Sequence, residues 1–296
     1  MTQNIKTILD NYSMNHAEFP LISPNELSGR IDDPNLAVLD CSWYLPTENR
    51  NPEHEFRSGH IPGARFFDID AISDPDSDLP HMLPKPEYFS KAVERLGVSN
   101  DSQVIVYDGK GLFSAARVWW MFRVFGHQSI HLLSGGLPAW LAEGFPTSNQ
   151  DSEITSGTFD VDFDSGKVAS MQDILNNLET GESVVLDARS AGRFMGTDPE
   201  PRPELKSGHM PGALSLPFTE LLEDGRLKSV EELKQIFENR GIVNGRKLIT
   251  SCGSGVSAAV INLALVICGY GMQRLYDGSW TEWASHTDNP VVSENP

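Results

Sequence analysis

The stretch LITSCGSGVSAAVINLALVICGY, residues 248–270, carries the pattern that decides the fold. A short apolar run at 248–250 is typical of a buried strand, and a loop of small residues follows at 252–257. A nearly continuous apolar segment at 258–268 is then typical of a buried helix. A strand, a tight loop and a helix in this order aim successive backbone N–H groups at one point.

Cys252 stands at the start of that loop, between the predicted strand and the predicted helix. Gly253 and Gly255 can adopt positive φ without steric cost, which lets the loop amides converge. Converging amides and a helix N-terminus both favour the thiolate form of a cysteine. We therefore predict that Cys252 is a nucleophile; the alternative is an inert cysteine buried before a core helix.

The chain repeats one plan twice. Strands alternate with helices in both halves, which predicts an α/β fold of two tandem domains, each a mainly parallel sheet with helices on both faces. The predicted boundaries are 1–147 for the first domain, 148–166 for a polar linker and 167–296 for the second domain. The repeat is carried by matching segments: 38–41 with 184–188, 58–64 with 207–213, 107–111 with 251–255, and 134–140 with 276–283.

The repeat places Asp108 of the first half opposite Cys252 of the second half. A carboxylate does not replace the thiolate nucleophile predicted at Cys252, and its charge repels an anionic substrate. The first domain is therefore predicted to be non-catalytic.

Composition narrows the possible partners and location. The net charge of −18 over 296 residues argues against nucleic acid and against an anionic membrane surface. Three cysteines without a CxxC pair favour a reducing compartment without disulfides. We see no signal peptide and no apolar run long enough to span a membrane, and expect a cytoplasmic protein. No metal-ligand spacing and no phosphate-binding P-loop motif is found, so no metal or cofactor is expected.

With these features in place, the sequence resembles the tandem rhodanese-domain sulfurtransferases over nearly the whole chain. The resemblance rests on the two GH(I/M)PGA motifs and on a cysteine loop in the second copy alone. The text Cys-Gly-Ser-Gly-Val is similar to the branch that uses 3-mercaptopyruvate, whereas thiosulfate-using members carry basic residues just after the cysteine. Further stretches similar to this branch are 81–84, 187–194, 200–202 and 276–280.

The resemblance implies sulfur transfer through a persulfide on Cys252, with release of pyruvate. It implies a small keto acid as substrate, and thioredoxin, small thiols or cyanide as acceptor. Arg193 and Arg202 match the family's substrate arginines, which suits a carboxylate because guanidinium offers a bidentate fork. Arg189 has two interpretations, a substrate contact or a structural partner of Asp187. The loop residues expected to hold the substrate sulfur are Gly253, Gly255, Val256 and Ser257.

The family's proposed Ser–His–Asp relay is matched only in part. Ser254 and His60 correspond to its serine and histidine, while Asn51 stands near the position of the aspartate. Ser254 is either a proton donor or a loop serine that bonds local backbone. His209 occupies the same repeated motif as His60, so the motif has a structural component.

Three other functions remain open at this point. A thiosulfate sulfurtransferase would use the same nucleophile with a dianionic donor. A cysteine phosphatase would need an arginine to close the loop, and Ala258 stands there instead. A non-catalytic binding module would keep the fold without turnover.

Overall fold

The computed structural model describes residues 19–293, which form two compact units. Unit 1 contains the residues up to Ile72, then Pro84–Phe163 and Asp224–Val230; unit 2 contains Ser73–Leu83, Asp164–Glu223 and the residues from Glu231 onward. Each unit therefore includes a short segment from the other half of the sequence. Most of the predicted linker, 148–166, belongs to unit 1, but the domain boundaries drawn from the sequence stay a prediction.

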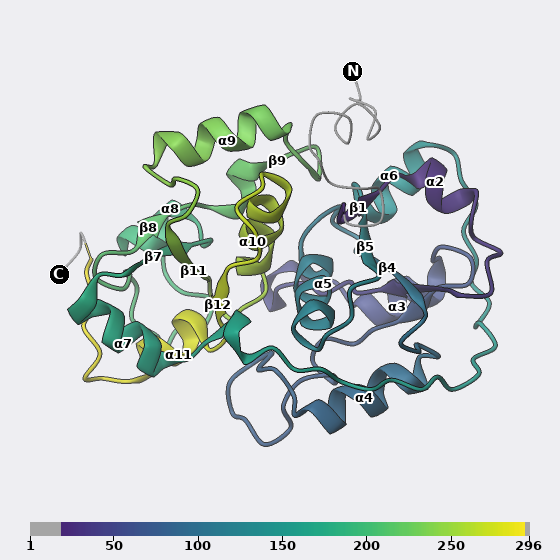
Figure 1. Ribbon diagram of the computed structural model, residues 1–296, viewed down its shortest axis with the longest axis horizontal. Coiled ribbons are helices and arrows are strands. Elements are labelled where there is room, and N and C mark those ends of the chain that lie inside the picture. The colour runs from purple at the N-terminus through teal and green to yellow at the C-terminus, as the bar shows by residue number, and fades with distance from the viewer. Residues whose placement is uncertain (1–18, 294–296) are drawn as a thin grey trace. The chain divides into compact units, whose positions relative to one another are not determined.

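Unit 1 is built on a parallel five-stranded sheet of order β1-β5-β4-β2-β3. Its strands are β1 (Leu21–Ile22), β2 (Leu36–Asp40), β3 (Arg65–Phe66), β4 (Gln103–Tyr107) and β5 (Ile130–Leu133). Its helices are α2 (Pro24–Ser28), η1 (Pro46–Glu48), α3 (Pro52–Ser58), α4 (Pro86–Arg95), α5 (Ser114–Val124) and α6 (Gly136–Ala142), and the short strand β10 (Arg226–Leu227) lies in the segment from the second half (Figure 1).

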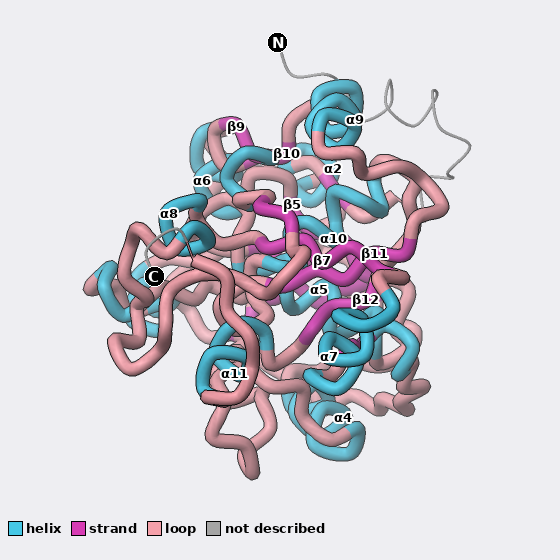
Figure 2. The backbone as a smooth tube through the Cα atoms, turned by 90° about the vertical axis from the view of Figure 1, so that its left-hand side faces the viewer, coloured by secondary structure: helices cyan, strands magenta, loops and turns pink. Residues whose placement is uncertain are grey.

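Unit 2 repeats this architecture with the sheet order β6-β12-β11-β7-β8, again parallel throughout. The strands are β6 (Val168–Ala169), β7 (Ser183–Asp187), β8 (Leu214–Ser215), β11 (Lys247–Ser251) and β12 (Arg274–Tyr276), with β9 (Leu222–Glu223) outside this sheet. The helices are η2 (Ser165–Lys167), α7 (Met171–Thr180), α8 (Ala191–Met195), η3 (Phe218–Leu221), α9 (Val230–Asn239), α10 (Ala258–Ile267) and α11 (Ser279–Ser285). Figure 2 shows β7, β11 and β12 side by side.

Helices cover both faces of the unit 2 sheet. They are needed on both faces because successive side chains along β11 point to opposite sides of the sheet. Ile249 packs in one buried cluster with Trp280 and Trp283 of α11. The next residue, Thr250, faces the opposite side, where its hydroxyl accepts a hydrogen bond from Asn262 of α10. Asn262 also binds the backbone of Gln273 at both its N–H and its carbonyl, so this buried amide fixes α10 against the sheet.

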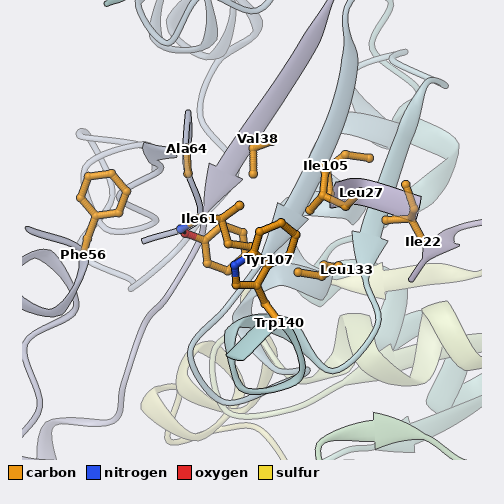
Figure 3. Close-up of a cluster of buried hydrophobic side chains, with 10 residues drawn as sticks. All are labelled: Ile22, Leu27, Val38, Phe56, Ile61, Ala64, Ile105, Tyr107, Leu133 and Trp140. Carbon is orange, nitrogen blue, oxygen red and sulfur yellow. The ribbon is translucent and has the colours of Figure 1, made fainter. Parts of the chain in front are cut away.

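The core of unit 1 likewise lies between the sheet and the helices that cover it. Ile105 and Tyr107 alternate along β4 and point to one face, where Trp140 of α6 covers them. Figure 3 shows these side chains packed with Val38 and Leu133 from the neighbouring strands. Burial of such aromatic and β-branched groups supplies most of the stability of the sheet.

The elements expected from the sequence are largely present. The predicted strand at 248–250 and the predicted helix at 258–268 are β11 and α10. In unit 1, Ser23 and Glu26 form a capping box at the start of α2. β3 ends at Phe66, and the Asp68 carboxylate then caps a turn. Within the described residues, no helix is long and apolar enough to cross a membrane.

Candidate active site

Cys252 follows the last residue of β11 at the carboxyl end of the unit 2 sheet. Its neighbour Ser251 pairs in register with Asp187 at the end of β7, so the polar residues after both strands share one edge. Cys252 is 1% exposed and carries a free thiol. A small-residue loop therefore presents this sulfur where parallel α/β sheets bind ligands.

The N-terminus of α11 fixes the orientation of the cysteine loop. The Trp280 N–H donates to the Cys252 carbonyl at 2.9 Å, and the Thr281 N–H donates to the Gly253 carbonyl at 2.9 Å. In a trans peptide the N–H points opposite to the C=O. The N–H groups of Gly253 and Ser254 are therefore turned away from α11, toward the concave side of the loop.

Ser279 takes up two other amides of the loop. Its Oγ accepts from the N–H of Cys252 at 3.2 Å and from the N–H of Gly255 at 3.1 Å, and it donates to the Tyr276 carbonyl at 2.8 Å. The expectation that every loop amide supports the sulfur therefore needs correction, because the Gly255 N–H is directed at Ser279. Ser279 is fully buried and has a φ of 50°, a left-handed conformation that its three hydrogen bonds hold.

The two loop glycines serve different purposes, which also corrects the sequence analysis. Gly255 has a φ of 76° and needs the freedom of glycine. Gly253 is not in the left-handed region; a Cβ at this residue would lie 3.1 Å from Nη2 of Arg193. The absence of a side chain at Gly253 therefore makes room for the close approach of the Arg193 guanidinium. Val256 and Ser257, the remaining predicted loop residues, are nearly buried between Gly255 and the start of α10.

Arg189 is a structural residue in this arrangement. Its guanidinium is fully buried, forms ion pairs with Asp187 at 2.6 Å and Glu200 at 2.7 Å, and donates to the Gly208 carbonyl at 2.7 Å. It also stacks over the ring of Trp280, 4.2 Å from its centroid. All three guanidinium nitrogens are engaged, so of the two interpretations left open, the geometry supports the structural one.

Arg193 and Arg202 approach the cysteine loop from the other side of Glu200. Arg193, whose side chain is 20% exposed, is held by Glu200 through Nε and Nη2 and lies beside Gly253. Arg202 donates to the Thr281 hydroxyl at 3.5 Å, and that hydroxyl donates to the Gly253 carbonyl at 2.6 Å. Both cations expected to bind substrate thus converge on the residue after the nucleophile.

The histidine in contact with the Ser254 side chain is His81. Nδ1 of His81 lies 2.9 Å from the Ser254 hydroxyl, and both residues belong to unit 2. The pairing of Ser254 with His60 that the sequence suggested is wrong. The His60 ring stacks on Phe56, and its nitrogens lie 2.8 Å from the Phe56 carbonyl and 3.2 Å from the Gln150 carbonyl.

His60 instead shares a structural role with His209. In unit 2 the His209 ring stacks on Phe194, and its Nδ1 lies 2.8 Å from the Phe194 carbonyl. Each histidine therefore closes the same turn of its own repeat. Asn51, near which the relay aspartate was expected, caps α3 by accepting from the His54 N–H.

Sequence reasoning missed His81 because it lies in the loop between β3 and α4, which comes from the first half of the chain but belongs to unit 2. His81 has a φ of 61° and is 3% exposed. The Asp277 carboxylate accepts from the Leu83 N–H at 2.7 Å, which anchors the loop two residues further on. The available signal was the stretch His81–Pro84, which resembles the mercaptopyruvate branch but was given no role.

Unit 1 provides an internal comparison for the cysteine loop. Asp108, at the position of Cys252, is buried, and its carboxylate accepts from the N–H groups of Lys110, Phe113 and Ala115 at 2.9, 2.7 and 3.0 Å. The first copy of this loop thus surrounds an anionic group with backbone amides. The same design in unit 2 is suited to an anionic sulfur.

Across residues 19–293, no cluster of three or more His, Cys, Asp or Glu side chains could hold a metal ion. The site is therefore described by its thiol, its loop amides, two arginines and the Ser254–His81 pair.

Comparisons with known proteins agree with the repeat. A family model described as "Rhodanese-like domain" matches residues 23–143 and 170–286. The 3-mercaptopyruvate sulfurtransferase of Escherichia coli (strain K12) is 45% identical over 266 residues, 90% of this chain and 95% of that protein. Thiosulfate/3-mercaptopyruvate sulfurtransferase 1, mitochondrial, of Arabidopsis thaliana is 41% identical over 296 residues, 93% of this chain and 78% of that protein.

A solved structure extends the likeness to three dimensions. The crystal structure of SseA from Escherichia coli, described as a 3-mercaptopyruvate sulfotransferase with the rhodanese fold, superposes with a TM-score of 0.81 at 42% identity. The match covers 88% of this chain and 98% of that chain.

Proposed function

Because the chain belongs to the rhodanese-like domain family and is a sulfurtransferase, we propose that it moves the sulfur of 3-mercaptopyruvate to a thiol or cyanide acceptor through a persulfide on Cys252. The observation that supports this most is the placement of Arg193 beside Gly253, directly after the only cysteine of the loop. A nucleophilic sulfur and a carboxylate-binding cation then act on the same small molecule.

The first half-reaction breaks the C–S bond of the donor. The Cys252 thiolate attacks the donor sulfur and forms an S–S bond, and the electron pair of the C–S bond leaves as the enolate of pyruvate. Protonation of the enolate gives pyruvate. In the second half-reaction, an acceptor thiolate attacks the outer sulfur and the Cys252 thiolate is restored, which predicts double-displacement kinetics.

The donor carboxylate is expected to lie between Arg193 and Arg202. Arg193 is only partly neutralised by Glu200, because Glu200 also pairs with Arg189. Arg202 makes one weak hydrogen bond, to the Thr281 hydroxyl, which leaves most of its guanidinium N–H groups for the substrate. A local pair of cations overcomes the acidic character of the whole chain for an anionic substrate.

The Ser254 hydroxyl is proposed to supply the proton to the leaving enolate. Its hydroxyl lies 2.9 Å from Nδ1 of His81, and an imidazole nitrogen can donate or accept a proton. His81 therefore takes the place that the sequence analysis gave to His60.

A thiosulfate sulfurtransferase is the second candidate, and the name of the Arabidopsis relative, which includes both donors, favours testing it. Thiosulfate is a dianion without a carboxylate, and the loop 252–257 carries no basic side chain for it. Thioredoxin or another thiol as acceptor, and a cytoplasmic location, stay predictions.

Both donors should be compared in parallel through cyanide-dependent formation of thiocyanate. Mercaptopyruvate is expected to give a much larger kcat/KM than thiosulfate. The reverse order would assign the chain to thiosulfate, and no turnover with either donor would favour a binding module.

The intermediate is tested separately by mass spectrometry. Treatment with mercaptopyruvate alone should add one sulfur, about 32 Da, to the peptide that contains Cys252. Absence of this gain in an active preparation would refute the persulfide. Cys252→Ser serves as the control, since it keeps the side-chain shape and removes the thiol.

A further inference from the structure

A cavity of about 190 Å³ opens in unit 1 at the carboxyl ends of β2 and β4. Its lining includes Asp40, Ser42, Gly59, Gly109 and Leu137. Gly109 stands one residue after Asp108, as Gly253 stands after Cys252. Tyr44 and Arg50 approach Gly109, as Arg193 approaches Gly253. The cavity beside Asp40 and Ser42 therefore corresponds to the place of the Arg189 side chain in the second repeat.

In unit 2 the corresponding space is filled by the guanidinium of Arg189. That group contacts the Asp187 carboxylate, the Gly208 carbonyl and the face of Trp280. Together with the ion pair to Glu200 at 2.7 Å, these contacts form a fully buried guanidinium-binding site.

The repeat assigns a counterpart in unit 1 to three of those contacts. Asp40 corresponds to Asp187, since both end a strand and accept from the N–H two residues later, at 2.9 and 3.0 Å. Gly59 and Gly208 precede the histidine of the repeated motif. Leu137 corresponds to Trp280, three residues before the tryptophans Trp140 and Trp283 that bind equivalent proline carbonyls.

The guanidinium itself has no counterpart, because Ser42 stands at the position of Arg189, and no described residue of unit 1 is matched to Glu200. The Ser42 hydroxyl binds Asp40 at 2.5 Å and accepts from the Gly109 N–H, but it is too short to fill the space. Unit 1 therefore keeps the other receptor groups of a guanidinium site around a cavity of suitable size.

The charges of the cavity leave Asp40 as the group in need of a cation. Arg50, also in the lining, is already committed: it pairs with Glu55 at 2.6 Å and stacks 3.7 Å over the ring of Tyr44. Asp40 is 3% exposed, and its carboxylate accepts hydrogen bonds from the N–H and the hydroxyl of Ser42. Burial raises the pKa of Asp40 to about 6, so the carboxylate is mostly ionised at neutral pH.

We propose that unit 1 binds the guanidinium group of a small molecule in this cavity, with Asp40 and the Gly59 carbonyl as acceptors and Leu137 against its face. The bound group reproduces three contacts of Arg189 in unit 2. The site is separate from Cys252 in sequence and chemistry, and it needs no group from the sulfur-transfer reaction.

The test is a titration of the full chain with methylguanidinium, followed by ligand-observed NMR and by isothermal calorimetry at pH 7.5. Saturable binding is expected, and methylammonium, of the same charge but without the planar fork, should bind at least about tenfold more weakly. Equal binding of the two ions would overturn the assignment of a guanidinium site.

Two variants locate the site. Asp40→Asn removes the charge with little change of shape, and Ser42→Arg fills the cavity with the side chain that unit 2 carries; each should abolish binding. Circular dichroism confirms that each variant is folded, and if Ser42→Arg does not fold, Asp40→Asn alone decides. Unchanged affinity in Asp40→Asn would overturn the proposal.

The pH dependence gives an independent readout. Binding to the ionised Asp40 should be strongest above the pKa of about 6 and should weaken as the pH falls through it, because protonation removes the charge. Affinity that stays constant between pH 7.5 and pH 5 would contradict the role of this carboxylate.

Discussion

Replacing Arg189 with methionine should destabilise unit 2 far more than the same change at Arg193. Arg189 is the buried cation between Asp187 and Glu200, whose side chains are each 1% exposed. Its removal leaves Asp187 with a backbone N–H from the same turn but without its counter-ion. Breaking a buried ion pair in this way costs about 3–5 kcal/mol, which is roughly two to four orders of magnitude in the unfolding equilibrium.

The matched variant is Arg193→Met. The Arg193 side chain is 20% exposed, and Glu200 keeps Arg189 as a partner when Arg193 is removed. The loss of stability should therefore be about 1 kcal/mol or less. The loss of activity should be larger, about 10- to 100-fold in kcat/KM for mercaptopyruvate, because a charge-assisted contact to the substrate carboxylate is removed.

Urea unfolding, followed by circular dichroism and by tryptophan fluorescence, measures the first effect. Steady-state kinetics on the folded protein measure the second. A cost below about 1 kcal/mol for Arg189→Met would refute the view that this residue holds the site together. An unchanged kcat/KM in Arg193→Met would remove the proposed carboxylate contact.

Three further outcomes are expected. Cys252→Ser should abolish sulfur transfer from both donors while the unfolding midpoint changes little, as shown by thiocyanate formation and thermal unfolding. Ser254→Ala and His81→Asn should each lower kcat with mercaptopyruvate by about 100-fold; asparagine tolerates the left-handed backbone of His81. The double variant should be no worse than either single one, and additive losses would contradict a shared proton path. Thr281→Val should lower kcat/KM about fivefold by removing the hydroxyl between Arg202 and Gly253, whose carbonyl keeps the Thr281 N–H; full activity would exclude that hydroxyl as a positioning group.

The fold and the loop that carries Cys252 could be predicted from the sequence because their signals are local. The apolar run, the glycine-containing loop and the apolar helix of residues 248–268 are contiguous, and β11 and α10 form where the pattern predicts them. The repeat then supplied the architecture of the other unit. Strand alternation and helix length follow from neighbouring residues, which a single sequence contains in full.

The partners of the site were harder to predict because they depend on distant residues. Arg189 and Arg193 are the same residue type, four positions apart at the start of α8, yet one is buried against Asp187 and the other reaches Gly253. No local sequence pattern distinguishes the buried arginine from the one that reaches Gly253. His81 was missed since it comes from a loop of the first half of the chain that belongs to unit 2, whereas the motif around His60 drew attention by being repeated.

The buried carboxylate of Asp108 limits the number of sulfur atoms that one chain can hold. Because its two oxygens already satisfy three amides of the first loop, that loop cannot take on a second sulfur. If the proposed persulfide forms on Cys252, each chain holds one sulfur at a time and must transfer it before it can accept another. In rapid-quench experiments with donor alone, the burst of pyruvate should stop at one equivalent per chain, however much donor is supplied.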